Sequence, residues 1–122
     1  LSGESAAGKY PIEAVETMAR IAERTERAID YDGRMLRSAP RNLADVKTAV
    51  SYATCTTARN LSADAIITVT MSGFTAEMVS RYKPSCPIVA CSVNPRVCRQ
   101  MALLWGVTPV LMQKEENTKE LN

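Results

Sequence analysis

The sequence predicts an α/β fold, a three-layer parallel sheet with helices on both of its faces. Short apolar runs rich in β-branched residues, typical of buried parallel strands, occur at residues 65–70, 88–93 and 107–112. Segments with apolar residues at helical spacing precede these runs and separate them. Strands that alternate with helices in this way imply a parallel sheet with right-handed crossover connections.

The composition is that of a globular protein and argues against several classes of partner. Hydrophobic residues make up 46% of the 122 residues and charged residues 23%. The net charge of +2 is too small to indicate a nucleic-acid partner, and no apolar run approaches the length of a transmembrane helix. We therefore expect no nucleic-acid partner, no membrane partner and a cytoplasmic location.

Four cysteines and the absence of histidine restrict the chemistry of the chain. Cys55, Cys86, Cys91 and Cys98 form no Cys-x-x-Cys pair, and their spacing does not offer four zinc ligands. Without histidine, no Ser-His or Cys-His nucleophile is available. We interpret the cysteines as free thiols of a cytosolic protein and predict no metal site in this chain.

The first forty residues predict a loop, a helix and a linker. Residues 1–10 are small and polar, and Pro11 suits the first turn of a helix that we place over residues 11–30. Residues 31–41 include Gly33 and Pro40 and lack periodicity, so we predict a linker at a domain boundary there.

A second helix is predicted over residues 42–61, with Asn42 as its N-terminal cap. Small residues line most of its apolar face, and Ala49 and Ala53 are central among them. Small side chains let another backbone approach closely, so this helix is expected to pack tightly against a partner surface.

Asparagine and proline residues position the remaining elements. The helix over residues 75–82 is ended by Pro84, and Asn94 and Pro95 cap and open the following helix. Pro109 lies within the third strand and has no N–H to donate, so we expect this strand at an edge of the sheet.

The most informative loop runs from Thr70 to Thr75, between a predicted strand and a predicted helix. Open α/β sheets bind ligands at this position. The loop hydroxyls, Gly73 and the free N–H groups of a helix terminus together suit a phosphate. An ordinary turn with a helix cap explains the same residues, so both interpretations stay open. Similarly, Arg96 either faces the same crevice or is a solvated surface side chain.

A second candidate loop contains Ser2, Glu4 and Ser5 between glycines. A glutamate in such a loop acts as a base, as a metal ligand or simply as a capping residue. A lone carboxylate does not establish a site.

Two long motifs resemble one enzyme family. Residues 1–15, LSGESAAGKYPIEAV, closely resemble the pyruvate kinase pattern L-S-G-E-[ST]-A-x-G-x-Y-P-x-E-A-V, which marks the last βα unit of that family's catalytic (β/α)₈ barrel. Further segments match the order and spacing of the family's C-terminal domain: residues 65–70, 72–76, 81–84, 87–90 and 105–107. The chain thus resembles the C-terminal part of a pyruvate kinase over nearly its whole length.

The resemblance implies a domain organisation and an activity. Residues 1–30 would be the last loop and helix of the barrel, residues 31–41 a linker, and residues 42–122 a truncated C-terminal domain. The family transfers a phosphoryl group from phosphoenolpyruvate to ADP, giving pyruvate and ATP, and it uses Mg²⁺ and K⁺. Its metal-binding acidic residues and catalytic lysine lie on earlier barrel strands, so we expect this chain to be a piece of a longer protein and inactive alone.

The resemblance also assigns roles to residues at the start of the chain. Ser2 matches a serine that lines the family's active site, and Glu4 is nearby in the same loop. Ala7 stands where some members have a lysine near the nucleotide phosphates. These residues would form only the periphery of the active site.

In the C-terminal part, the loop from Thr70 to Thr75 aligns with the loop that holds a phosphate of a sugar-phosphate activator in many members. Thr70, Ser72, Gly73 and Thr75 fit that pattern. Phe74, like Met71, stands where some activated members have a polar or basic residue. The resemblance therefore implies a phosphorylated effector, or inorganic phosphate or sulfate, as a ligand.

Assembly is the last implication of the resemblance. The helix over residues 42–61 matches the helix that meets its symmetry mate in the family's tetramer, which implies a homo-oligomer with Ala49 and Ala53 at the interface. In the family a fourth strand pairs beside the first, so the strand over residues 65–70 would expose one edge here. The alternative is a stand-alone, non-catalytic module that binds a phosphate ligand or directs assembly.

Overall fold

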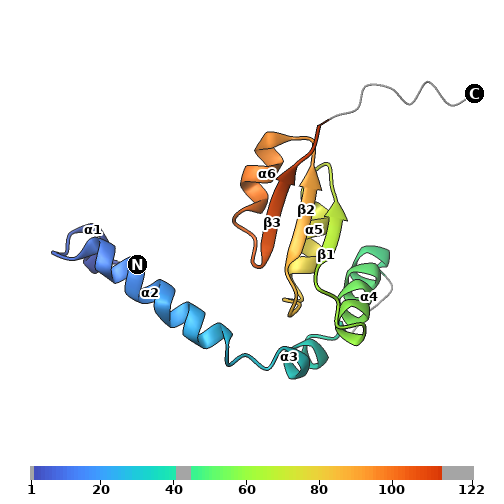
Figure 1. Cartoon of the computed structure of the whole chain (residues 1–122), viewed down its shortest axis with the longest axis horizontal. Helices are drawn as coiled ribbons and strands as arrows, with labels where there is room; N and C mark the ends of the chain where they lie inside the picture. The colour runs from blue at the N-terminus through green and yellow to red at the C-terminus, as the bar shows by residue number, and fades with distance from the viewer. Residues whose placement is uncertain (1, 41–44, 114–122) are drawn as a thin grey trace, which may run out of the picture. The chain divides into compact units, whose positions relative to one another are not determined.

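The computed structural model describes residues 2–40 and 45–113, and the chain divides into two compact units, Leu1–Asp30 and Tyr31–Asn122 (Figure 1). The first unit contains two helices, and the second contains a parallel sheet with its helices. Each unit is best understood by itself.

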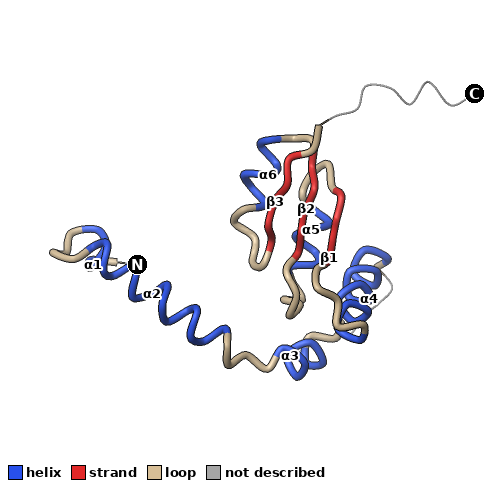
Figure 2. The backbone as a smooth tube through the Cα atoms, in the orientation of Figure 1, coloured by secondary structure: helices blue, strands red, loops and turns tan. Residues whose placement is uncertain are grey.

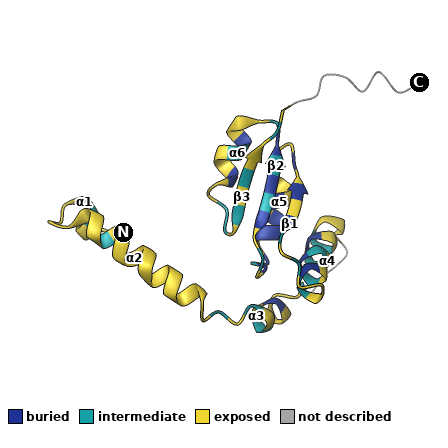
Figure 3. Cartoon of the chain, in the orientation of Figure 1, coloured by how far each residue is buried: buried dark blue, intermediate teal, exposed yellow. Residues whose placement is uncertain are grey.

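The first unit consists of α1 (Gly3–Ala6), where we expected a loop, and α2 (Pro11–Glu26). Pro11 occupies the start of α2 as predicted, but the helix ends at Glu26 rather than at residue 30. The N–H groups of Ala28 and Ile29 bond to carbonyls three residues back, so the chain tightens into a turn there. Most residues of α2 are exposed (Figure 3), including its large apolar residues Ile12, Val15, Met18 and Ile21.

The second unit is an α/β domain, which confirms the predicted fold class. Its three strands are parallel in the order β1-β2-β3, with Ile66 opposite Ile88 and Ile88 opposite Val107. Its elements are α3 (Tyr31–Arg37), α4 (Val46–Asn60), β1 (Ile66–Val69), α5 (Phe74–Ser80), β2 (Ile88–Ser92), α6 (Pro95–Met101) and β3 (Val107–Leu111). Among the described residues β3 pairs only with β2, so Pro109 does lie on an edge strand.

The helices α4, α5 and α6 cover one face of the sheet (Figure 2). Strands added in sequential order through right-handed crossovers place α5 and α6 on the same side. Alternate residues of β1 therefore differ sharply in solvent exposure. Ile66 is buried, whereas Ile67 and Val69 on the other face are 72% and 67% exposed. The predicted second layer of helices is not found among the described residues, because a crossover to the opposite face requires a strand on the other side of β1.

The core consists of two clusters of buried side chains. The larger one joins α3, α4 and α5 to the sheet and contains Met35, Cys55, Ala58, Ile66, Val79, Tyr82 and Ile88. The smaller one joins α5 and α6 to β2 and contains Ala76, Ala90, Val97 and Met101. Burial raises the pKa of the Cys55 thiol to about 11, and this thiol donates a hydrogen bond to the Val79 carbonyl at 3.6 Å. Cys55 is accordingly a packing residue.

The segment predicted as an irregular linker, residues 31–41, instead begins with the helix α3. Met35 is its one buried residue, and it packs in the larger cluster with only 3% of its surface exposed. A seven-residue helix anchored by one side chain has no apolar stripe, so periodicity did not reveal it.

Asp45 caps α4, in place of the predicted Asn42, which lies outside the described residues. The Asp45 carboxylate accepts hydrogen bonds from the N–H and hydroxyl of Thr48 at 2.9 and 2.7 Å, and these bonds lower its pKa. The predicted cap of α6 is confirmed, because Asn94 Oδ1 accepts the Arg96 N–H at 3.0 Å.

Two glycines adopt the left-handed backbone conformation that other residues avoid. Gly73, before α5, has φ +86, and a Cβ placed on it would lie 3.2 Å from the Met101 side chain and 3.4 Å from Val97. Gly106, before β3, has φ +67, but a Cβ there would meet nothing within 4 Å. Gly73 is therefore required both by its backbone and by close packing against α6.

We predict that Gly73→Ala lowers the free energy of unfolding by about 2–3 kcal/mol, because it combines backbone strain with crowding against Met101. Gly106→Ala is the matched control, with the same strain but open space, and should cost about 1 kcal/mol. Urea unfolding followed by circular dichroism measures both values. Equal losses in the two variants would show that packing against α6 contributes nothing.

Candidate functional site

The predicted phosphate loop begins at the carboxyl edge of the sheet, where hydrogen bonds between neighbouring chain segments hold the backbone. Beyond the end of β1, the N–H of Thr70 bonds to the Cys91 carbonyl at 2.9 Å. Beyond the end of β3, the N–H of Met112 bonds to the Ser92 carbonyl at 2.9 Å. The loops that follow β1 and β2 therefore start at the same edge, as the parallel topology requires.

Two of the predicted loop hydroxyls stabilise the loop itself. The Thr70 hydroxyl accepts the Gly73 N–H at 2.9 Å, and the Ser72 hydroxyl accepts the Phe74 N–H at 3.4 Å. Thr70 is only 6% exposed, whereas Ser72 and Thr75 are open to solvent. Thr70 thus holds the loop in shape, and the hydroxyls available to a ligand are those of Ser72 and Thr75.

One exposed backbone donor, the N–H of Thr75, remains open at the start of α5. The first N–H of this helix to bond to a backbone carbonyl is that of Glu77, which reaches the Gly73 carbonyl at 3.0 Å. The N–H groups of Thr75 and Ala76 have no acceptor among the described residues. Ala76 is fully buried, so the loop brings together one accessible N–H donor, that of Thr75, and two hydroxyls.

The structure places a cation beside the loop that no sequence pattern indicated. The Lys47 ammonium of α4 lies over the Phe74 ring, 4.9 Å from its centroid. The two residues are far apart in sequence and meet because α4 packs against α5, so no spacing pattern could have paired them. Arg96, the cation considered from the sequence, is exposed, and no contact joins its side chain to the loop within residues 45–113.

The second candidate loop, in the first unit, holds an ionised carboxylate. The Ser2 hydroxyl donates to Glu4 at 2.6 Å, and this bond lowers the pKa of the exposed Glu4 side chain. A carboxylate with a lowered pKa is a weak base, so the structure does not favour Glu4 as a proton acceptor. Ala7 follows directly as the residue after α1, and its N–H bonds to the Gly3 carbonyl.

Metal-binding geometry is absent from the described part of the chain. No three side chains of His, Cys, Asp or Glu gather there in positions that could hold an ion. The described residues therefore do not provide a Mg²⁺ site.

The exposed side of α4 is apolar. Val46, Val50 and Leu61 are 72%, 58% and 73% exposed, and Ala53 is exposed between them. The opposite side of α4 packs into the core through Ser51, Cys55 and Ala58. The apolar face read from the sequence is therefore the outward one, and Ala49 lies half-buried at its border.

Comparison with known proteins points to one family. The family described as "Pyruvate kinase, alpha/beta domain" matches residues 48–122. The chain is 45% identical over 121 residues to a pyruvate kinase of Clostridium acetobutylicum, covering 99% of this chain and 26% of that protein. It is 44% identical over 107 residues to one of Geobacillus stearothermophilus, covering 88% of this chain and 18% of that protein.

Solved structures agree with these relatives. A crystal structure of a pyruvate kinase from Cryptosporidium parvum is similar with a TM-score of 0.82 and 34% identity, over 97% of this chain and 24% of that chain. A structure of the Cryptosporidium parvum enzyme in complex with ADP is similar with a TM-score of 0.73 and 36% identity, over 92% and 23%. The chain thus spans about a quarter or less of the length of these relatives.

None of the described helices has the length and apolar character needed to cross a membrane. The parallel sheet, the matched domain and the relatives agree with one another. This chain belongs to the pyruvate kinase family.

Proposed function

We propose that the chain is the effector-binding and assembly part of a pyruvate kinase, whose whole protein transfers a phosphoryl group from phosphoenolpyruvate to ADP in the cytoplasm. The observation that carries the proposal is the loop from Thr70 to Thr75, with the open N–H of Thr75 at the carboxyl edge of the sheet. Residues 1–30 then correspond to the last loop and helix of the catalytic barrel, residues 31–41 to a linker, and residues 42–122 to the C-terminal domain. Mg²⁺ and K⁺ belong to other parts of the whole protein.

The loop suits a dianion better than a neutral sugar. Thr75 offers an N–H donor, Ser72 and Thr75 offer hydroxyls, and Lys47 supplies a positive charge nearby. The ligand class is therefore a phosphorylated effector, or inorganic phosphate or sulfate. With this loop alone gripping it, affinity is expected to be about millimolar, or roughly 4 kcal/mol.

A second role is proposed for the outward face of α4. An apolar helix face lined by small residues allows a second copy of the helix to approach closely, and Val46, Val50 and Leu61 are the side chains such contact would bury. We assign Ala49 and Ala53 to this homo-oligomeric interface, which would contribute to a tetramer in the whole protein.

The alternative is a stand-alone, non-catalytic module that binds phosphate ligands or directs assembly. The same loop and the same α4 face support it, because both lie in the second unit. Ser2 and Glu4 separate the two proposals: in the enzyme they line the periphery of an active site completed elsewhere, and in a module they have no such role.

We predict no phosphoryl transfer from phosphoenolpyruvate to ADP by this chain with Mg²⁺ and K⁺ present. The physical reason is that phosphoryl transfer depends on bound metal ions and a cationic side chain, which the family carries on barrel strands outside this chain. A coupled assay for pyruvate measures the rate. Turnover above a blank without protein would contradict the prediction.

Inorganic phosphate should shift the amide signals of Thr75 and Ala76 in an NMR titration, with chloride at equal ionic strength as the control. Thr75→Asp should abolish these shifts, because its carboxylate competes for the same donors while favouring the helix start. Gln100→Glu, an exposed change of equal charge on α6, should leave them intact. Shifts elsewhere, or shifts that survive Thr75→Asp, would identify the loop as an ordinary turn.

Self-association of the chain should be visible by light scattering as a dimer. Ala53→Arg should convert it to a monomer, because a long charged side chain blocks close approach of two α4 helices. Gln100→Arg on α6 is the matched control and should remain dimeric. A monomer in the unmodified chain would overturn the assignment of this interface.

A further inference from the structure

A polar hollow of about 490 Å³ lies at the amino edge of the sheet. Residues 62–64, which lead into β1, and residues 85–87, which lead into β2, form two of its sides, so it lies at the edge opposite the candidate phosphate loop. The end of α4 and the beginning of α3 line the rest, and all of these segments belong to the second unit. Its charged and polar lining residues are Asp32, Arg59, Ser62, Asp64, Ser85 and Cys86.

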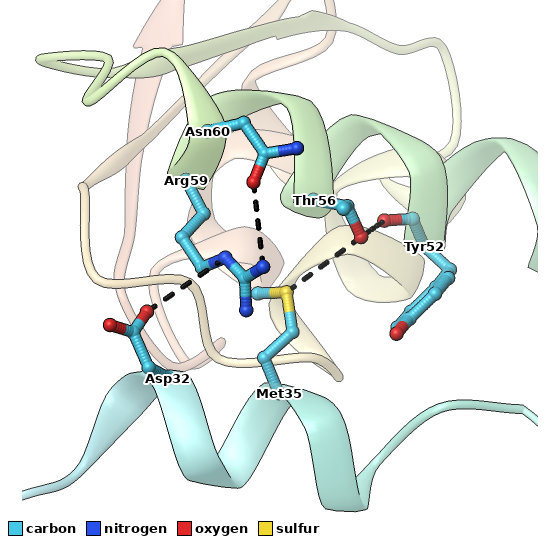
Figure 4. Close-up of polar contacts among 6 residues, drawn as sticks. All are labelled: Asp32, Met35, Tyr52, Thr56, Arg59 and Asn60. Atoms are coloured by element: carbon cyan, nitrogen blue, oxygen red, sulfur yellow. Dashed lines mark hydrogen bonds and ion pairs between the residues drawn. The ribbon is translucent and has the colours of Figure 1, made fainter.

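Arg59 is the cation of this hollow, and it is held loosely. Its side chain is 29% exposed, so most of it is withdrawn from water. Its Nε lies 3.9 Å from the Asp32 carboxylate, and its Nη2 donates to Asn60 Oδ1 at 3.4 Å (Figure 4). Hydrogen bonds from a guanidinium to a carboxylate are ordinarily about 2.7–2.9 Å long and often paired. A carboxylate that enters the hollow therefore gains shorter bonds to Arg59 than Asp32 makes.

The two carboxylates of the hollow face solvent. The Asp32 side chain is 77% exposed, and Asp64 is exposed between α4 and β1. Together with Arg59 they give the lining one more negative than positive charge. The helix α4 also ends here, and the carbonyl groups at the end of a helix add partial negative charge. The hollow is thus complementary to a ligand with one carboxylate and two cationic groups.

Contacts within the chain position the walls of the hollow. The N–H of Ser62 bonds to the Arg59 carbonyl at 3.0 Å, which ends α4 and turns the chain toward β1. In α3, Met35 is buried in the larger core cluster, and Figure 4 shows Met35 and Asp32 projecting from α3 toward α4. A hollow formed in advance lowers the cost of ordering on binding.

We propose that this hollow binds a basic α-amino acid, with its carboxylate on Arg59 and its two ammonium groups on Asp32 and Asp64. The ligand carboxylate takes the place beside Arg59 that Asp32 holds loosely, and Asp32 then receives an ammonium group. The volume of the hollow is that of a small-molecule site. The site is separate from the candidate phosphate loop and does not rest on the function proposed for that loop.

Cys86 is a natural probe inside the hollow. It lines the hollow and is partly exposed, whereas Cys91 and Cys98 are partly exposed outside it. Alkylation of the native chain by iodoacetamide is followed for each thiol by mass spectrometry. An excess of L-lysine over its Kd should slow alkylation of Cys86 at least about threefold and leave Cys91 and Cys98 unchanged. Sodium chloride at equal ionic strength should slow none of the three.

Two relatives of L-lysine separate the contributions of its charges. L-norleucine lacks the side-chain ammonium, and cadaverine lacks the carboxylate. Each should protect Cys86 with a Kd at least about tenfold higher, because each leaves a charged group of the hollow without its partner. Equal protection by L-norleucine and L-lysine would exclude a basic amino acid as the ligand class.

Substitutions test the assigned contacts. Arg59→Gln should abolish the protection of Cys86 by L-lysine, and Asp64→Asn should weaken it. Arg99→Gln, an exposed change of equal charge on α6, is the matched control and should leave it intact. In an NMR titration, L-lysine should shift the amide signals of residues 62–64 and 85–86 and leave those of residues 72–76 in place.

The proposal is overturned if L-lysine neither protects Cys86 nor shifts the amides of residues 62–64. Equal protection of all three partly exposed thiols would overturn it as well, since the effect would then be general to the chain. Protection that survives Arg59→Gln would remove the carboxylate contact on which the proposal depends. The ligand series on the unmodified chain decides the question by itself if Arg59→Gln does not fold.

Discussion

Burial of one face of the β1–β2 pair is the constraint on which the second unit depends. Ile88 is fully buried at the centre of this face, between β1 and β3. Val79 of α5, Cys55 of α4 and Met35 of α3 pack in the cluster that contains Ile88. Each of these three helices is therefore positioned by the same face of the sheet. The parallel pairing that creates this face also brings the loops after β1 and β2 to one edge.

That packing fixes the geometry of the candidate phosphate loop. Gly73 lies against Met101 of α6, so the turn before α5 packs on the smaller core cluster. Thr70 holds it from the strand side through the Gly73 N–H. A loop fixed at both ends offers the open N–H of Thr75 without a rearrangement, which lowers the cost of ordering on binding. The weak affinity proposed for a lone phosphate comes from the small number of donors.

The two sides of α4 show how one helix serves both stability and proposed assembly. Its inward side carries small or weakly polar residues such as Ser51 and Ala58, which let α4 lie close to α5 and the sheet. Its outward side carries the larger apolar residues, Val46, Val50 and Leu61. Solvent-exposed apolar area of this kind favours contact with a second surface. The open face of β1, with Ile67 and Val69, has the same character.

The sequence by itself determined the parallel α/β class through hydrophobic periodicity, and the edge position of β3 through the missing N–H of Pro109. It also determined the capping of α6, because the short Asn94 side chain bonds to the backbone beside it. Each of these signals acts locally along the chain. The sequence also located the loop from Thr70 to Thr75. Tertiary structure decided what depends on partners distant in the chain. Burial of Met35 stabilises a helix in the predicted linker, and packing of α4 on α5 brings Lys47 to Phe74. Sequential strand order places α5 and α6 on one face of the sheet. Such contacts join residues that no local pattern relates.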